Sequence, residues 1–181
     1  MNKTAGIYEL QKEVSGVGMK FFFISKGKHD IIKVIQYSYI QDLMGRSIFN
    51  LGFGDYDVEN DKIVDDIITN NGDAYKVFNS VLSSIPFFFE NFANGILMIQ
   101  GSDGKPEYID KCKLSCMKKC LNECKDYNRR INLYLSYVDK NYDKLSPDYQ
   151  FFGGFINDNQ QTTLEEYERY KKYDAVFLFK K

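Results

Sequence analysis

Acidic and amide side chains gather in one stretch of this 181-residue sequence. The members that could do chemistry are Asp55, Asp57, Asp65, Asp66, Asn70, Asn71 and Asp73. Mg²⁺ and Ca²⁺ bind several oxygen ligands of this kind, and paired carboxylates can divide general acid and base roles. The same residue types are the ordinary occupants of turns and helix caps, and residues 57–61 lack the calcium-loop pattern of the EF-hand. The stretch is therefore a candidate polar site, to which we assign no catalytic residue, metal or cofactor.

Four evenly spaced cysteines are the second group that could do chemistry: Cys112, Cys116, Cys120 and Cys124. On one continuous helix the outermost pair would stand roughly 18 Å apart, too far for a single tetrahedral zinc ion to bind all four. Free cysteine is among the most buried residue types, so the spacing favours a core stripe. Metal binding by neighbouring pairs, or a redox role, stays open.

The charge pattern makes nucleic acid an unlikely main partner. The formal net charge is −1, and the arginines are Arg46, Arg129, Arg130 and Arg169. Phosphate recognition uses arginines clustered on a basic face. The one histidine, His29, lies in a Gly-Lys-His-Asp turn, where it could act as a single base but could not build a multi-histidine metal site. Whether the protein is an enzyme is left open.

The sequence predicts a cytoplasmic location without a membrane segment. No run approaches the roughly 18 apolar residues that a transmembrane helix needs. The first residues lack the apolar core of a signal peptide, and the cysteines are not spread as a disulfide framework.

The hydrophobic pattern predicts an α+β fold: a mostly antiparallel sheet with a central helix and a long second helix packed on it, in a single domain over residues 1–181. Strands are expected at residues 6–14, 19–25, 31–40, 48–53, 67–69, 96–99, 151–156 and 175–179. The central helix should run from Asp73 to Phe92, capped by Asp73 or Asn71 and interrupted by Pro86. Its predicted core residues are Phe78, Val81, Leu82, Ile85 and Phe89.

Two further helices are expected towards the end of the sequence. Apolar steps of three and four indicate a long helix over residues 110–143, or two helices broken near Lys125. A short charged helix should run from Thr163 to Tyr173, because Thr163-Leu164-Glu165-Glu166 fits a capping box.

The second half of the long helix is a candidate interface. Tyrosine pairs an apolar ring with a polar tip and is enriched at protein interfaces. The candidate interface residues are Tyr127, Tyr134, Tyr137 and Tyr142. They are expected to bind a second copy of the chain or a small protein partner. The alternative is that they cover the strand at residues 151–156.

A series of short motifs resembles a family of uncharacterised bacterial proteins, mostly from Bacteroidetes, of the DUF6934 type. The motifs are residues 50–55 (NLGFGD), Asp65-Asp66, residues 70–73 (NNGD), Gly101-Ser102 and residues 173–181 (YDAVFLFKK). The resemblance implies a compact bacterial cytoplasmic domain without an established activity. Family members follow the Gly-Ser turn with an arginine-rich segment, whereas this sequence has residues 103–108 (DGKPEY) there.

Two classes of function are expected from these observations. The first is a protein-interaction or accessory module, of the kind found in toxin–antitoxin or phage-defence cassettes, which binds a protein partner or itself. The alternative is a metal-dependent hydrolase or nuclease that uses the Asp/Asn set.

Overall fold

The protein divides into two compact units, Met1–Gly95 and Ile96–Lys181. The computed structural model describes residues 6–43, 45–64, 71–115, 120, 124–125, 127–157, 159 and 161–181. Each unit combines helices with an antiparallel sheet, so the predicted α+β class with mostly antiparallel strands is confirmed. The single domain over residues 1–181 stays a prediction.

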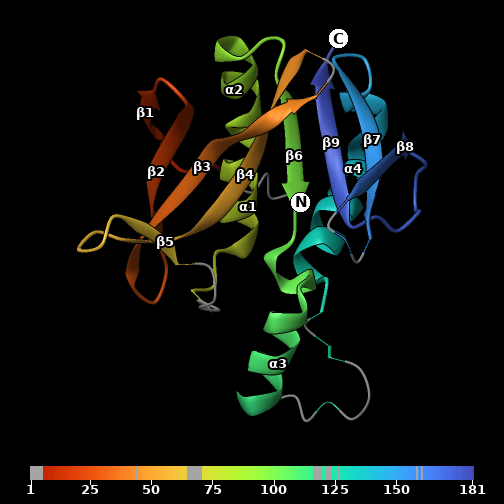
Figure 1. Cartoon of the computed structure of the whole chain (residues 1–181). Helices are drawn as coiled ribbons and strands as arrows, with labels where there is room; N and C mark the ends of the chain where they lie inside the picture. The colour runs from red at the N-terminus through yellow and green to blue at the C-terminus, as the bar shows by residue number, and fades with distance from the viewer. Residues whose placement is uncertain are drawn as a thin grey trace, which may run out of the picture. The chain divides into compact units, whose positions relative to one another are not determined.

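The first unit is built on a meander of antiparallel hairpins (Figure 1). Its strands, each paired with the next, are β1 (Gln11–Ser15), β2 (Gly18–Lys26), β3 (Asp30–Leu43), β4 (Arg46–Asp57) and β5 (Lys62–Val64). The turns carry the residues that tight reversals favour: Gly45 joins β3 to β4 with a φ of 75°, and Asp61 precedes β5 with a φ of 46°. The predicted strand at residues 67–69 lies outside the described residues.

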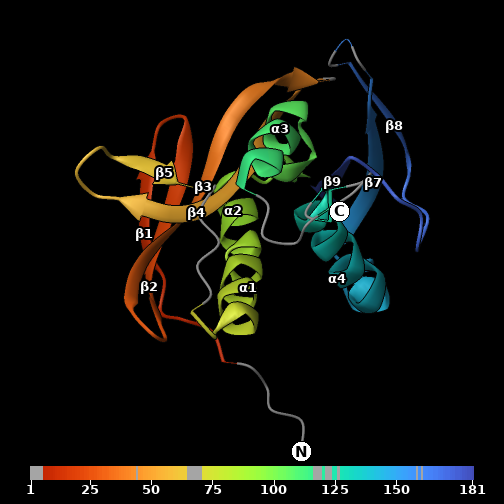
Figure 2. The same cartoon turned by 90° about the horizontal axis from the view of Figure 1, so that it is seen from below.

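Two helices, α1 (Ala74–Ser83) and α2 (Ile85–Asn91), lie along one face of this sheet (Figure 2). The sequence predicted one helix interrupted by Pro86, and the structure places the break at Ser84. Proline has no N–H to donate, so Pro86 is tolerated within the first turn of a new helix but not in the interior of one.

The core of the first unit is aromatic and centres on Phe88. Its ring centroid lies 4.8 Å from that of Tyr37 and 5.2 Å from that of Phe49. Of the predicted core residues, Val81, Ile85 and Phe89 are buried. The remaining two, Phe78 and Leu82, are only half-buried.

The second unit has an antiparallel sheet of four strands in the order β6–β9–β7–β8. The strands are β6 (Ile96–Gln100), β7 (Tyr149–Ile156), β8 (Thr162–Glu166) and β9 (Ala175–Lys180), and three of them were predicted from sequence. A short 3₁₀ turn, η1 (Ser102–Gly104), precedes the helices α3 (Pro106–Ser115) and α4 (Arg129–Leu145). Among the described helices, none is long and apolar enough to cross a membrane.

Of the two helix predictions in this unit, the first holds only in its alternative form and the second is corrected. The expectation of one continuous helix over residues 110–143 is wrong, whereas the alternative of two helices with a break near Lys125 agrees with α3 and α4, and the described residues between them (120, 124–125 and 127–128) are not helical. The expected helix from Thr163 to Tyr173 is wrong, because β8 occupies its first part and pairs with β7. The hydrogen bonds of that pairing outweigh the weak local signal of a capping box.

Gly153 on β7 leaves room for a side chain from the segment after β8 to pack on the sheet. A Cβ atom added to Gly153 would lie 2.0 Å from the ring of Tyr173, so only glycine allows this ring to rest on β7.

Replacing Phe88 with Ala should lower the free energy of unfolding by about 3–5 kcal/mol, because the side chain is fully buried and its site relaxes only partly. The matched control is Phe87→Ala, whose ring is 42% exposed and should lose only about 1–2 kcal/mol. Urea unfolding of both variants measures the difference. Equal losses would show that Phe88 is not the centre of the core.

Candidate functional site

The described members of the predicted Asp/Asn set come from two segments of the first unit. Asp55 and Asp57 lie on β4, whereas Asn71 and Asp73 lie in the segment that leads into α1. Asp65, Asp66 and Asn70 lie outside the described residues. Four members can therefore be followed to their partners.

Asp73 belongs to a hydrogen-bonded network that ties the start of α1 to the sheet. Its Oδ2 accepts hydrogen bonds from the hydroxyls of Tyr8 and Ser25, both at 2.7 Å. The predicted capping role is corrected: Asp73 occupies the N-cap position of α1, but its side chain makes no cap hydrogen bond. The carboxylate points to β2 instead, because the buried Ser25 hydroxyl needs a partner.

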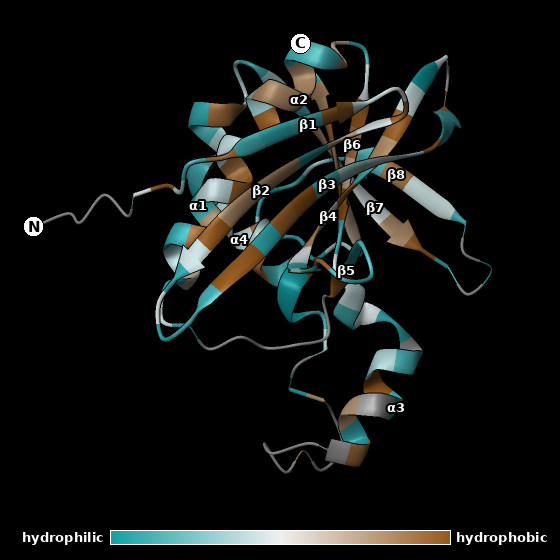
Figure 3. Ribbon diagram, turned by 90° about the vertical axis from the view of Figure 1, so that its left-hand side faces the viewer, coloured by the Kyte–Doolittle hydropathy of each residue, from teal (hydrophilic) through white to brown (hydrophobic). Residues whose placement is uncertain are grey.

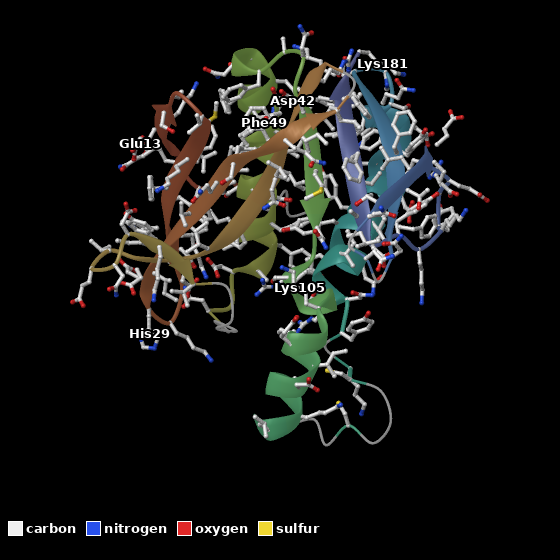
Figure 4. The ribbon with its side chains drawn as sticks, in the orientation of Figure 1. Glu13, His29, Asp42, Phe49, Lys105 and Lys181 are labelled. Carbon is white, nitrogen blue, oxygen red and sulfur yellow. The ribbon has the colours of Figure 1, made fainter. Side chains whose placement is uncertain are left out.

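Asn71 extends this network to the turn between β2 and β3. Its Nδ2 donates to Ser25 Oγ at 2.8 Å and to the carbonyl of His29 at 3.0 Å, while the His29 N–H donates to Asn71 Oδ1 at 3.0 Å. A Cβ atom on Gly27 would lie 1.9 Å from the Asn71 carbonyl oxygen, so the turn requires glycine. Figure 4 shows His29 at this turn. We call Tyr8, Ser25, Asn71 and Asp73 the polar anchor.

The polar anchor favours the ionised form of Asp73. Burial alone would raise the pKa of this carboxyl, but the hydrogen bonds from Tyr8 and Ser25 and the positive charge of Lys33 outweigh it, and the pKa is lowered. Burial also raises the pKa of the Tyr8 hydroxyl, which stays a donor.

Asp55 forms a buried ion pair with Lys33, its direct cross-strand partner on β3. The two side chains are 17% and 8% exposed. Removing one partner of such a pair leaves an uncompensated charge inside the protein, which is strongly unfavourable. Asp55 therefore serves to hold Lys33 in the interior.

Asp57 shapes the turn between β4 and β5. Its carboxylate accepts hydrogen bonds from the backbone N–H groups of Glu59 and Asn60, at 3.1 and 3.2 Å, and from Asn60 Nδ2 at 2.7 Å. The Asn60 side chain contributes most to lowering the pKa of Asp57. This arrangement is the ordinary Asx turn, in which the acid organises backbone.

The chemistry of the four described members is therefore that of structural polar groups. In the part of the chain that the structure describes, no three His, Cys, Asp or Glu side chains gather in a way that could hold a metal ion. Whether the complete set forms a site remains a prediction.

Replacing Asp73 with Asn should lower stability at neutral pH by about 1–3 kcal/mol, because Tyr8 and Ser25 lose a charged acceptor. The folded pKa of Asp73 is depressed, so its contribution is complete above the ordinary aspartate range near pH 4 and is lost as the pH falls through the lower folded value. The stability difference between wild type and variant should therefore narrow in acid.

Urea unfolding at a series of pH values measures this difference, with the exposed Asp30→Asn as control. A double-mutant cycle with Tyr8→Phe should show coupling between the two side chains. A difference that stays constant from neutral to acid pH would contradict the role given to the charge.

A concave groove of about 420 Å³ is the second feature of the first unit, and the sequence did not predict it. It lies where the end of the β3–β4 hairpin meets the residues that follow α2; Figure 4 labels Phe49 and Asp42 near this end. Its lining residues are Gly16, Val17, Tyr39, Gly45, Arg46, Ser47, Phe49, Phe92, Asn94 and Gly95. We call it the hairpin groove.

Three aromatic rings form the apolar surface of the hairpin groove. Tyr39 and Phe49 are direct cross-strand partners with ring centroids 6.1 Å apart, and Phe49 lies 4.4 Å from Phe92. A register shift between Tyr39 and Gln41 marks a β-bulge. Such bulges change the direction of side chains and are common next to active sites. Tyr39 is left 46% exposed.

Arg46 supplies the charge of the hairpin groove. It is exposed and is the one charged residue among the described lining residues. The adjoining turn is held by a hydrogen bond of 2.8 Å from the Ser47 hydroxyl to Asp42. An arginine beside aromatic rings suits a ligand that joins an apolar group to a carboxylate.

The four tyrosines proposed as an interface differ in environment. Tyr142 packs on Phe151 of β7, with ring centroids 5.7 Å apart, which is the covering role considered as the alternative. Tyr134 and Tyr137 are half-buried, and burial raises the pKa of Tyr134 to about 12. Tyr127 is 44% exposed. The interface stays a prediction.

Comparison with known proteins identifies a family but no activity. The model of a family of unknown function, DUF6934, matches residues 5–111, and the chain belongs to this family. The family predicted from the central motifs is thereby confirmed. No curated protein and no solved structure matches the chain.

Proposed function

We propose that this DUF6934 protein is a binding module whose hairpin groove accepts a short segment of a protein partner. The observation that carries the proposal is the pairing of an aromatic surface, formed by Tyr39, Phe49 and Phe92, with the charge of Arg46. The segment that fits carries an aromatic or aliphatic side chain next to an aspartate or glutamate.

The shape of the hairpin groove supports a peptide segment. It is an open groove of about 420 Å³, at the low end of the size range of small-molecule sites. Peptide recognition commonly anchors one or two side chains in such apolar surfaces while a charged neighbour sets the register.

The setting that we propose is the cytoplasm of a bacterium, where the protein acts as an accessory component of the toxin–antitoxin or phage-defence kind. Its support is the resemblance of the central motifs to bacterial proteins and the composition of the chain. Protein is favoured over nucleic acid as the partner because the net charge is −1.

The alternative, a metal-dependent hydrolase or nuclease, makes a different prediction. If the Asp/Asn set binds Mg²⁺ or Mn²⁺, millimolar metal should raise the melting temperature, since binding to the folded state stabilises it. In the structure, Asp55, Asp57 and Asp73 are each held by groups of the protein itself, which makes them less available as metal ligands.

Panning a displayed library of short peptides on the full chain tests the proposal. Wild type should enrich peptides in which an aromatic or aliphatic residue adjoins an acid, and Arg46→Glu should shift the preference towards basic residues, because charge complementarity sets specificity. Tyr39→Ala should lower the affinity for the enriched peptides by roughly tenfold or more.

Two exposed residues outside the hairpin groove provide matched controls: Tyr75→Ala, at 83% exposure, and Lys62→Glu. Neither should change the selection. Peptides without an acidic preference, or peptides whose binding survives both groove substitutions, would refute the proposed mode. Capture of a second copy of the chain in place of these peptides would do the same.

A further inference from the structure

The second unit brings together two cysteines that a continuous helix would hold far apart. Cys112 lies on α3, which ends at Ser115, and Cys124 lies in a non-helical stretch before α4. Their Sγ atoms are 3.5 Å apart, and both are half-buried cysteines outside any disulfide. On one helix their separation would be roughly 18 Å, so the contact exists because Cys124 does not continue α3.

We propose that Cys112 and Cys124 are a redox pair that a low-molecular-weight disulfide, such as glutathione disulfide, oxidises to an intramolecular disulfide. The inference is independent of the hairpin groove, which belongs to the other unit.

The oxidation requires the two sulfurs to move closer. A disulfide has a sulfur–sulfur distance of about 2.05 Å, so the two sulfurs, which lie 3.5 Å apart, must approach by roughly 1.5 Å. Partial exposure gives a small oxidant access to the thiols.

The lysines beside the pair favour an anionic oxidant. The third described cysteine, Cys120, has a different partner. Lys113 and Lys125 flank the pair in sequence and are both exposed, so both can attract the carboxylates of glutathione disulfide, although Lys113 also pairs with the exposed Asp110 at 3.6 Å. The Cys120 sulfur instead accepts a hydrogen bond of 3.3 Å from the backbone N–H of Lys125. Cys116 lies outside the described residues.

The reaction is two successive thiol–disulfide exchanges. The thiolate of one cysteine attacks a sulfur of glutathione disulfide, the S–S bond breaks, and one glutathione leaves as a thiolate that takes up a proton. The thiolate of the second cysteine then attacks the protein sulfur of this mixed disulfide and releases the second glutathione. The two protein sulfurs are oxidised, the two glutathione sulfurs are reduced, and both thiol protons pass to the released glutathione.

The product would tie the end of α3 to the stretch before α4. A cross-link constrains the unfolded chain, so oxidation should raise the melting temperature by a few degrees. Reduction by excess glutathione or dithiothreitol should reverse the rise.

The test uses the full chain, reduced, desalted and equilibrated in glutathione buffers of increasing oxidised fraction. After alkylation of free thiols, intact mass should show the loss of two hydrogen atoms, and peptide mapping should join Cys112 to Cys124. Cys112→Ser and Cys124→Ser should each abolish this cross-link and leave a glutathione adduct on the remaining cysteine.

Cys120→Ser and the double variant Cys116→Ser/Cys120→Ser are the matched controls, and both should keep the cross-link. A disulfide between other cysteines would overturn the proposal. So would full alkylation of both thiols in glutathione disulfide, or a zinc ion in the purified protein that Cys112→Ser releases, which would make the pair metal ligands.

Discussion

A buried contact between Tyr37 and Ser84 sets the position of the helices in the first unit. Their hydroxyl oxygens lie 2.5 Å apart, and both side chains are fully buried. The Tyr37 ring also stacks on Phe88, one turn into α2. Moving the helix break along the sheet would separate the two buried hydroxyls and the stacked rings, which is costly. The junction of α1 and α2 is therefore fixed on β3.

With the junction fixed, the start of α1 and the end of α2 meet different surroundings. At the start of α1, the polar anchor joins the helix to the sheet through hydrogen bonds from the hydroxyls of Tyr8 and Ser25 to Asp73. The helix α2 ends at Asn91, whereas the β3–β4 hairpin carries aromatic residues beyond that point. These residues line the hairpin groove. The hydropathy colouring of Figure 3 shows the contrast between the apolar β2 and β3 and the polar β1 beside them. The proposed binding function rests on the groove, whereas the anchor joins α1 to the sheet.

In the second unit, a buried carboxylate holds the long helix in place. The buried carboxylate of Asp139 on α4 accepts hydrogen bonds from the Tyr167 hydroxyl at 2.8 Å and from the Tyr170 N–H at 3.1 Å. These bonds and the packing of Tyr142 on Phe151 hold α4 on its sheet. The paired cysteines precede α4 in the chain: Cys112 lies on α3, and Cys124 lies in the non-helical stretch before α4. A reversible cross-link there would leave the sheet unchanged.

The sequence by itself determined the family, the α+β class and most strands, because alternating apolar residues between glycine-rich turns are local signals. It also placed the apolar stripe that holds Val81, Ile85 and Phe89. It did not determine β8, where pairing with β7 decided between strand and helix.

Only the tertiary structure decided the two candidate sites. Tyr39, Phe49 and Phe92 come together through strand register and the end of α2, which no local spacing encodes. Cys112 and Cys124 meet in the folded protein, whereas their spacing on a continuous helix predicted separation. Asp73 was expected as a cap, but the buried hydroxyl of Ser25, distant in sequence, directs its carboxylate to the sheet. In each case the deciding physical factor is a contact between different segments of the chain, and a pattern within one segment carries no information about it.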